Sequence, residues 1–202
     1  ICAFSETKTT LSVYVISNIE EIQSYLNEQA HRGKTIGFTP TMGALHDGHM
    51  SLLRASKEQC DVSVVSIFVN PTQFNNPSDL ENYPRRMEED LALLEKNDCD
   101  VVFTPSEEAI YPENFKGVSM DLSIVNEEME GTFRPGPLLA FVNVVFRFFE
   151  ILRPSKAFFG LKDFQQVTII KMMVEELNLV TEVVGCETLR AENGLAMSSR
   201  NY

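Results

Sequence analysis

The chain has 202 residues, of which 44% are hydrophobic and 23% are charged, as in an ordinary globular protein. Its formal net charge of −12 at pH 7 argues against a surface for nucleic acid or anionic membrane, because either partner requires a basic face. Its four cysteines form no Cys-x-x-Cys pair, and no run approaches the roughly 18 apolar residues of a membrane span. We therefore expect a cytoplasmic protein with small-molecule ligands and neither a nucleic-acid nor a membrane partner.

Strand-like and helical patterns alternate along the chain. Apolar, β-branched runs predict strands at 11–16, 35–38, 62–69, 100–104, 156–159 and 181–186. Helices are expected at 19–32, capped by Asn18, and at 50–59, 85–97, 124–129, 138–152 and 164–178, with a loop over 70–77. The apolar run 141–146 would also suit a strand. Short connections between alternating elements predict one α/β domain over 1–202, with a Rossmann-like, doubly wound parallel sheet.

The turn between the expected strand 35–38 and the expected helix 50–59 contains two histidines. It reads Thr39-Pro-Thr-Met-Gly-Ala-Leu-His-Asp-Gly-His49. A helix start offers free backbone N–H groups and a positive dipole end, and imidazoles add donors and positive charge near neutral pH. The combination favours a polyphosphate site. A turn with two solvated histidines and a glycine chosen for its backbone freedom explains the same pattern.

Three further polar loops directly follow expected strands or lie near the end of the chain. They are 70–73, 160–166 and 197–200. Each alone is explained by a turn, a helix cap or a surface loop. Ligands of open parallel sheets bind outside the carboxyl ends of the strands, so the four loops should converge there.

A histidine turn, a lysine after a strand and a late Ser-Ser-Arg loop resemble the ATP-binding apparatus of the nucleotidylyltransferase superfamily. Five blocks resemble the pantothenate synthetase family more closely, in the order of that family, over most of 13–202. They are Pro40-Thr-Met-Gly-Ala-Leu-His-Asp-Gly-His49, Val65-Ser-Ile-Phe-Val-Asn-Pro-Thr-Gln-Phe74, Tyr83-Pro-Arg85, Phe159-Gly-Leu-Lys-Asp-Phe-Gln-Gln166 and Gly194-Leu-Ala-Met-Ser-Ser-Arg-Asn201. The resemblance implies ATP-dependent condensation of (R)-pantoate with β-alanine through a pantoyl-adenylate, giving pantothenate, AMP and pyrophosphate. It also implies Mg²⁺ as a cofactor and a homodimer.

The resemblance assigns roles to residues of this chain. It implies that ATP is bound by Met42, Gly43, Ala44, Leu45, His46, Asp47, Gly48, His49, Gly160, Leu161, Lys162, Asp163, Leu189, Met197, Ser198, Ser199 and Arg200. Among these, His46, His49, Lys162 and Arg200 are the implied catalytic residues, with His49 as a proton donor. Gln73 and Gln166 would hold pantoate, with Asn70 and Tyr83 beside it. Side-chain amides suit that task because each offers a donor and an acceptor.

The chain departs from the family in two places. Pro137 stands where the family has a pocket-facing histidine, and Ala140 stands where it has a glycine. The family also continues into a smaller C-terminal domain that closes over the site, whereas this sequence ends at Tyr202. We expect this lid domain to be absent from the chain, and turnover by the chain alone to be weak or absent.

Two other functions are compatible with the same residues. One is a different small-molecule nucleotidylyltransferase, which would have no use for two pantoate-binding glutamines at Gln73 and Gln166. The other is a non-catalytic module that binds ATP and pantoate, which Pro137 and the expected absence of a lid leave open.

Overall fold

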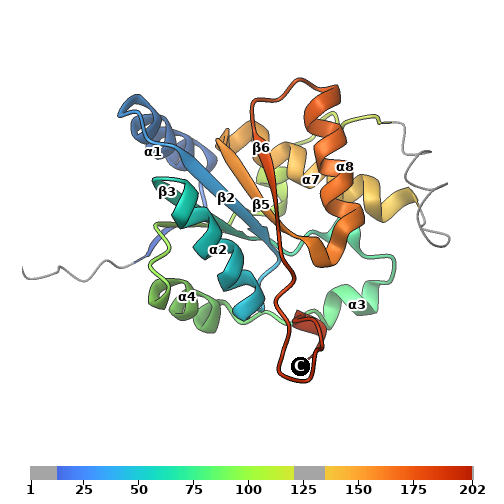
Figure 1. Cartoon of the computed structure of the whole chain (residues 1–202). Coiled ribbons are helices and arrows are strands. Elements are labelled where there is room, and N and C mark those ends of the chain that lie inside the picture. The colour runs from blue at the N-terminus through green and yellow to red at the C-terminus, as the bar shows by residue number, and fades with distance from the viewer. Residues whose placement is uncertain (1–12, 121–134, 202) are drawn as a thin grey trace, which may run out of the picture.

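We describe the chain from a computed structural model, which covers residues 13–120 and 135–201. Its centre is a six-stranded sheet in the order β1-β4-β3-β2-β5-β6, and every pairing is parallel. The strands are β1 (Tyr14–Ile16), β2 (Ile36–Thr41), β3 (Val62–Ile67), β4 (Val101–Phe103), β5 (Lys156–Gly160) and β6 (Glu182–Cys186). The chain winds outward from β2 in both directions, as Figure 1 shows, so the predicted doubly wound α/β fold is confirmed.

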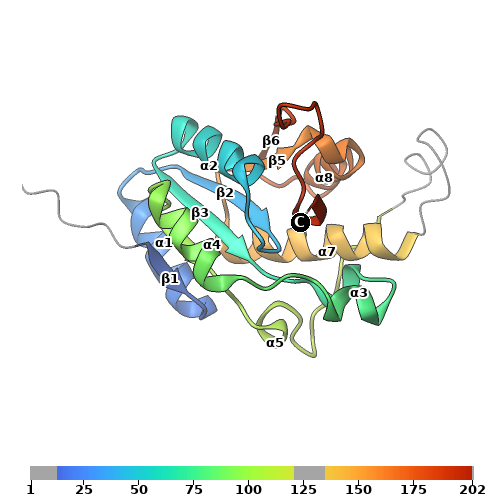
Figure 2. The ribbon, with the colours of Figure 1, turned by 90° about the horizontal axis from the view of Figure 1, so that it is seen from below.

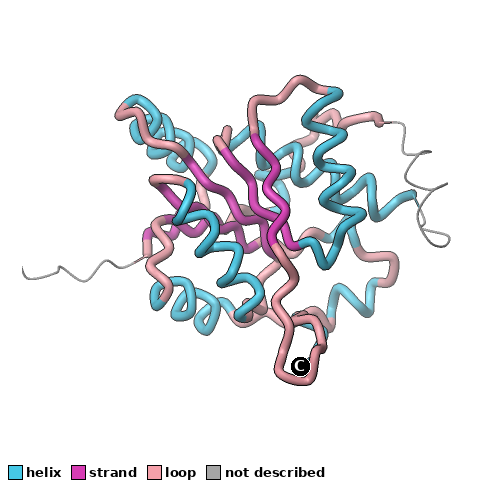
Figure 3. The backbone as a smooth tube through the Cα atoms, in the orientation of Figure 1, coloured by secondary structure: helices cyan, strands magenta, loops and turns pink. Residues whose placement is uncertain are grey.

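Helices cover both faces of the sheet, as the tube in Figure 3 shows. The longer ones are α1 (Ile19–His31), α2 (Asp47–Gln59), α4 (Met87–Lys96), α7 (Pro135–Leu152) and α8 (Phe164–Glu176). Short ones are α3 (Pro77–Glu81), α5 (Glu107–Ile110) and the 3-10 turns η1 (Pro71–Gln73), η2 (Leu161–Asp163) and η3 (Ser199–Asn201). No helix within the described ranges has the length and apolar character needed to cross a bilayer.

The hydrophobic core has one part on each face of the sheet. Alternation along β3 sends Val64 towards α1, α7 and α8, and Val65 towards α2 and α4. Figure 2 shows α2 and α7 on opposite sides of the strands. Burial on both faces explains why β3 reads as a nearly continuous apolar and β-branched run.

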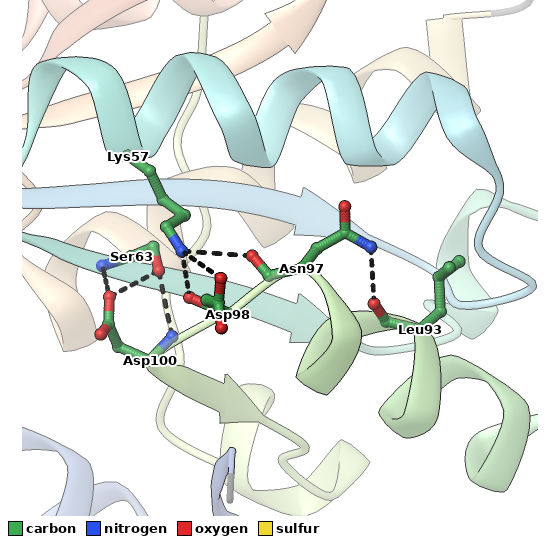
Figure 4. A network of polar contacts seen from close by, with 6 residues as sticks. All are labelled: Lys57, Ser63, Leu93, Asn97, Asp98 and Asp100. Carbon is green, nitrogen blue, oxygen red and sulfur yellow. Dashed lines mark hydrogen bonds and ion pairs between the residues drawn. The ribbon is translucent and has the colours of Figure 1, made fainter. Parts of the chain in front are cut away.

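A polar network fixes the amino-terminal edge of the sheet (Figure 4). Lys57 of α2 donates to the carbonyl oxygens of Asn97 and Asp98, at 3.2 and 2.6 Å, just beyond the end of α4. Ser63 of β3 donates its backbone N–H and its hydroxyl to the Asp100 carboxylate, at 2.8 and 2.7 Å. These contacts hold α2, α4 and β3 in register at the edge opposite the candidate site.

Most predicted elements are confirmed, including Asn18 as the N-cap of α1, whose side chain accepts from the N–H of Glu21. The alternative of a strand at 141–146 is wrong, since that run lies inside α7. Helix α2 starts at Asp47 rather than 50, because His46 acts as its N-cap. The segment 70–77 is not wholly a loop, since η1 lies within it. The expected helix at 124–129 lies outside the described residues.

Strand β2 continues through Pro40, beyond its predicted end at 38. Pro40 has no backbone N–H, which normally excludes proline from a central strand. Here β2 pairs with β5 only at Gly37 and Phe38, while its pairing with β3 continues to Thr41. Proline is therefore accommodated where one side of the strand has already separated from its neighbour, and that separation opens the sheet at its carboxyl edge.

Candidate functional site

A cavity of about 300 Å³ opens at the carboxyl edge of the sheet. It lies where the chain winds away from β2 towards β3 on one side and towards β5 on the other. Open parallel sheets bind ligands at such a switch point. Residues from all four polar loops line this cavity, so the predicted convergence of the loops is confirmed.

Two histidines form one wall by capping α2. Nδ1 of His46 accepts a hydrogen bond from the N–H of Gly48 at 3.1 Å, and Nδ1 of His49 accepts from the N–H of His46 at 3.2 Å. Their ring centroids lie 4.1 Å apart. Because both Nδ1 atoms act as acceptors, each neutral ring carries its proton on Nε2, where it can serve as a donor.

The free chain keeps both histidines neutral at pH 7. Burial and the nearby Lys162 ammonium lower the pKa of His46. Burial, His46 and Lys162 lower the pKa of His49 to about 3. The positive charge that the sequence suggested for these rings is therefore not present in the free chain, because desolvation and the neighbouring cation oppose it. Lys162 supplies positive charge on this side of the cavity; its side chain is 39% exposed and lies 3.9 Å from the carboxylate of Asp163.

The turn before the histidines is held by Asp90 of α4, which is 3% exposed. Its carboxylate accepts from the N–H groups of Ala44 at 2.9 Å and Leu45 at 2.7 Å. Gly43 and Ala44 both have positive φ, of 80° and 48°. A Cβ at Gly43 would lie 2.9 Å from the Asp90 carboxylate, so glycine is needed both for the conformation and for the close approach.

The late loop closes over the histidine turn. The Ser199 hydroxyl donates to the carbonyl oxygen of Ala44 at 3.0 Å, across 155 positions of sequence. Met197, Ser198 and Ser199 all line the cavity. The backbone of Arg200 lies in η3, whereas its side chain lies outside the described part of the structure, so its predicted role in ATP binding stays a prediction.

The opposite wall carries amides organised by a buried network. Asn70, 1% exposed, donates from Nδ2 to Oε1 of Gln73 at 2.9 Å. Its Oδ1 accepts from the hydroxyls of Tyr111 at 2.8 Å and Thr72 at 2.9 Å. Gln166, from the first turn of α8, also lines the cavity. The predicted substrate-binding set of Asn70, Gln73, Tyr83 and Gln166 therefore faces a single space.

An apolar floor completes the cavity, and the sequence analysis did not predict it. Its side chains come from the segment after β3, from α7 and from β5. They are Phe68, Phe141, Val144, Val145, Phe148, Phe158 and Phe159. A run such as 141–148 reads as ordinary core, and only the fold shows that one face of α7 also reaches the cavity. This floor suits a ligand with an aliphatic part.

The residues predicted for ATP fall into two groups. Those lining the cavity are Met42, His46, Gly48, His49, Gly160, Lys162, Asp163, Leu189, Met197, Ser198 and Ser199. Gly43, Ala44, Leu45, Asp47 and Leu161 are not on its wall. Gly43, Ala44 and Leu45 shape the turn instead, through the contacts with Asp90. Sequence reasoning missed Asp90, Tyr111 and the lining residues Glu187 and Thr188.

Pro137 lies in the first turn of α7 and does not line the cavity. The first turn of a helix tolerates proline because its N–H groups have no partner within the helix. The backbone therefore accommodates this departure within a regular helix. Ala140 lies in the next turn and is also absent from the cavity wall.

No group of three or more His, Cys, Asp or Glu side chains within 13–120 and 135–201 is placed to hold a metal ion. Magnesium needs no such cage when it is coordinated by nucleotide phosphates and water. The described residues therefore offer no cluster of their own for a metal ion, which leaves coordination by a bound nucleotide as the way for magnesium to enter.

Comparison with known proteins points to a single family. A family model described as pantoate-beta-alanine ligase matches residues 14–202. Curated pantothenate synthetases from Leptospira biflexa and Carboxydothermus hydrogenoformans are 46% and 49% identical to this chain. The alignments cover 93% and 92% of the chain and 66% and 65% of those relatives. The chain thus spans about two thirds of the length of the curated relatives that it matches.

Solved structures show the same architecture. The pantoate-beta-alanine ligase of Francisella tularensis, complexed with beta-gamma ATP and β-alanine, superimposes with a TM-score of 0.87 at 43% identity. The match covers 94% of this chain and 72% of that one. Pantothenate synthetase from Thermus thermophilus gives a TM-score of 0.85 at 39% identity. Because the family model matches 14–202 and the relatives and solved structures agree with it, the chain belongs to the pantoate–β-alanine ligase family.

Proposed function

We propose that this chain binds ATP and pantoate in the cavity at the carboxyl edge of its sheet and forms pantoyl-adenylate, which β-alanine converts to pantothenate. One observation carries the proposal. A single cavity combines a cationic and histidine-lined wall, from His46, His49 and Lys162, with an amide wall from Gln73 and Gln166. The first suits polyphosphate and the second suits a hydroxy acid.

In the first step, a carboxylate oxygen of pantoate attacks the α-phosphorus of ATP. The new P–O bond forms as the bond from the α-phosphorus to the pyrophosphate oxygen breaks. The chain has little covalent chemistry to perform, and its task is alignment and stabilisation of charge on the departing pyrophosphate. Nε2–H groups of His46 and His49, with the Lys162 ammonium, are the donors for that charge. Bound Mg²⁺ would neutralise phosphate oxygens.

In the second step, the amine nitrogen of β-alanine attacks the acyl carbon of the adenylate. The amide C–N bond forms, the bond from the acyl carbon to the AMP oxygen breaks, and the amine loses its proton. This step requires exclusion of water, because water would hydrolyse the mixed anhydride. The apolar floor around Phe148 and Phe158 supports that requirement by limiting hydration of the acyl group.

Calorimetric titration tests the binding part of the proposal. The chain should bind ATP with Mg²⁺ and, separately, pantoate. Gln73→Ala and Gln166→Ala should weaken pantoate binding and leave ATP binding unchanged. Gln165→Ala is the matched control, because Gln165 is adjacent to Gln166 in α8 and does not line the cavity. A wild-type chain that fails to bind pantoate, or mutants that bind it normally, would contradict the assigned substrate.

Release of AMP then separates the candidate functions. Pantoate-dependent release of pyrophosphate followed by β-alanine-dependent release of AMP supports the ligase. Nucleotide transfer to a phosphorylated acceptor without pantoate would indicate another nucleotidylyltransferase. Because turnover by the chain alone is expected to be weak, binding without either product even at chain concentrations equal to those of the substrates would indicate a non-catalytic module. We further propose, from the family resemblance, a cytoplasmic location and a homodimer. Light scattering of the purified chain can test the homodimer.

A further inference from the structure

The wall that would receive the acid contains a relay of hydrogen bonds that starts outside the cavity. Tyr111, which follows α5, donates its hydroxyl proton to Oδ1 of Asn70 at 2.8 Å. Nδ2 of Asn70 donates in turn to Oε1 of Gln73 at 2.9 Å. Asn70 and Gln73 line the cavity, whereas Tyr111 does not. The hydroxyl of Tyr111 is thus linked to the ligand space through Asn70.

The relay determines which group of Gln73 is available to a ligand. Oε1 of Gln73 accepts from Nδ2 of Asn70, so the amide is oriented with its oxygen towards Asn70 and its Nε2 on the other side. The remaining polar group is Nε2, which can only donate. An amide that presents Nε2–H binds the oxygen of a carboxylate or of a hydroxyl acting as acceptor. Reversal of the amide would present Oε1, an acceptor, which repels a carboxylate.

Asn70 is held in this orientation by two hydroxyls. Oδ1 accepts from Tyr111 and also from Thr72 at 2.9 Å, and these hydroxyls lie 3.3 Å from each other. Because Asn70 is only 1% exposed, water has little access to replace a lost donor. Removal of one hydroxyl should therefore loosen the amide, and removal of both should leave Oδ1 without a partner.

The ring of Tyr111 is anchored independently of its hydroxyl. Its centroid lies 6.5 Å from that of Phe68 and 5.6 Å from that of Phe115. Burial raises the pKa of Tyr111, so its hydroxyl remains protonated and able to donate at neutral pH. Replacement by phenylalanine consequently removes one hydrogen bond while retaining the packing of the ring.

We infer that Tyr111 is a positioning residue for recognition of the acid, since it orients the Gln73 amide through Asn70 so that Nε2–H faces the acid's oxygen. The inference rests on the proposed function, because it assumes that the acid binds at Gln73. Tyr111 lies outside the cavity, yet it would contribute to selectivity. A ligand with an oxygen acceptor next to Gln73 would bind better than a ligand with a donor group at that position.

Tyr111→Phe is the first test. We expect pantoate to bind roughly three- to tenfold more weakly, the size of one uncharged hydrogen bond, with ATP binding unchanged. Tyr14→Phe is the matched control, because it removes a hydroxyl that donates to Glu21 at the far edge of the sheet. Thr72→Val combined with Tyr111→Phe should weaken pantoate binding further. Normal pantoate binding by Tyr111→Phe would overturn the inference.

A double-mutant cycle separates positioning from general destabilisation. If Tyr111 acts through Gln73, then Tyr111→Phe should have no further effect on pantoate binding in a Gln73→Ala background. Equal effects of Tyr111→Phe in both backgrounds would overturn the proposed route.

Side-chain amide resonances of Gln73, assigned by comparison with Gln73→Ala, test the relay without any ligand. They should shift in Tyr111→Phe and not in Tyr14→Phe, and an unchanged resonance would refute the relay. Failure of the wild-type chain to bind pantoate would instead refute the proposed function. The spectrum would still show whether Tyr111 orients the Gln73 amide.

Discussion

The carboxylate of Asp90 lies 2.7 Å from the backbone nitrogen of Leu45 and also accepts from Ala44 at 2.9 Å. One buried side chain of α4 thus satisfies two consecutive N–H groups of the turn that leads to the histidines. That turn contains Ala44 with a φ of 48°, a left-handed conformation that is unfavourable for a non-glycine residue and needs external support. The geometry of the phosphate-facing wall therefore depends on a residue that does not itself line the cavity.

Asp90→Asn should weaken ATP binding by roughly ten- to a hundredfold, the loss expected when a charged acceptor of two hydrogen bonds is replaced by an amide with one acceptor atom. Pantoate binding should change little, because Gln73 and Gln166 lie on the other wall. Calorimetry with each ligand measures both effects. Glu88→Gln is the control, an exposed acid in the same helix, and an equal loss of ATP binding in both variants would contradict this role for Asp90.

Gly48→Ala should impair ATP binding although alanine normally stabilises a helix. An added Cβ would lie 2.8 Å from Cε1 and 2.9 Å from Nδ1 of His46, so the ring that caps α2 has to move. Gly136→Ala is the control, because a Cβ there meets no atom within 4 Å in the first turn of α7. ATP affinity should fall in the first variant only, and normal affinity in Gly48→Ala would show that the position of His46 is unimportant.

Lys162→Met should raise the pKa of His46 and of His49, because the ammonium of Lys162 contributes to the lowering of both. NMR titration of the imidazole resonances measures this directly. The same variant should bind ATP roughly ten- to a hundredfold more weakly through loss of a charged donor. Histidine pKa values that do not move would contradict electrostatic coupling across this wall.

Folding stability should decrease as the pH is lowered from about 6.5 towards 3, in part because of His49. The folded chain lowers the pKa of His49 from 6.5 to about 3, so between these values the unfolded chain binds more protons than the folded one. Urea unfolding at pH 7 and pH 5 should therefore show a larger loss of unfolding free energy in the wild type than in His49→Gln. An identical loss in both proteins would contradict a buried, neutral His49.

The sheet and the histidine turn could be predicted because their signals are local. β3 is an apolar run bounded by turn residues, and His46 and His49 are three positions apart. The predicted start of α2 is too late because a histidine is an uncommon N-cap, and the hydrogen bond from the N–H of Gly48 to His46 is what identifies the cap. Local pattern therefore specified the elements and the approximate place of the site.

The supporting residues could not be predicted because their contacts join distant parts of the sequence. Asp90 follows two other acids in α4 and reads as part of a solvated face, yet it bonds a turn 45 positions earlier. Tyr111 lies 41 positions from Asn70, in a stretch with weak periodicity. The apolar floor from α7 reads as core, since hydrophobicity alone does not distinguish a side chain that faces a cavity from one that faces a sheet.

The proposed function requires this cavity to join the carboxylate of pantoate to the α-phosphate of ATP. Pantoate labelled with ¹⁸O in both carboxylate oxygens is incubated with ATP, Mg²⁺, β-alanine and enough of the chain for a single turnover to be detected. Mass spectrometry should find one ¹⁸O atom in the AMP, because the bridging oxygen of the adenylate stays with phosphorus when the acyl carbon is attacked. AMP formed in a pantoate-dependent reaction without ¹⁸O would rule out attack of the carboxylate on the α-phosphate.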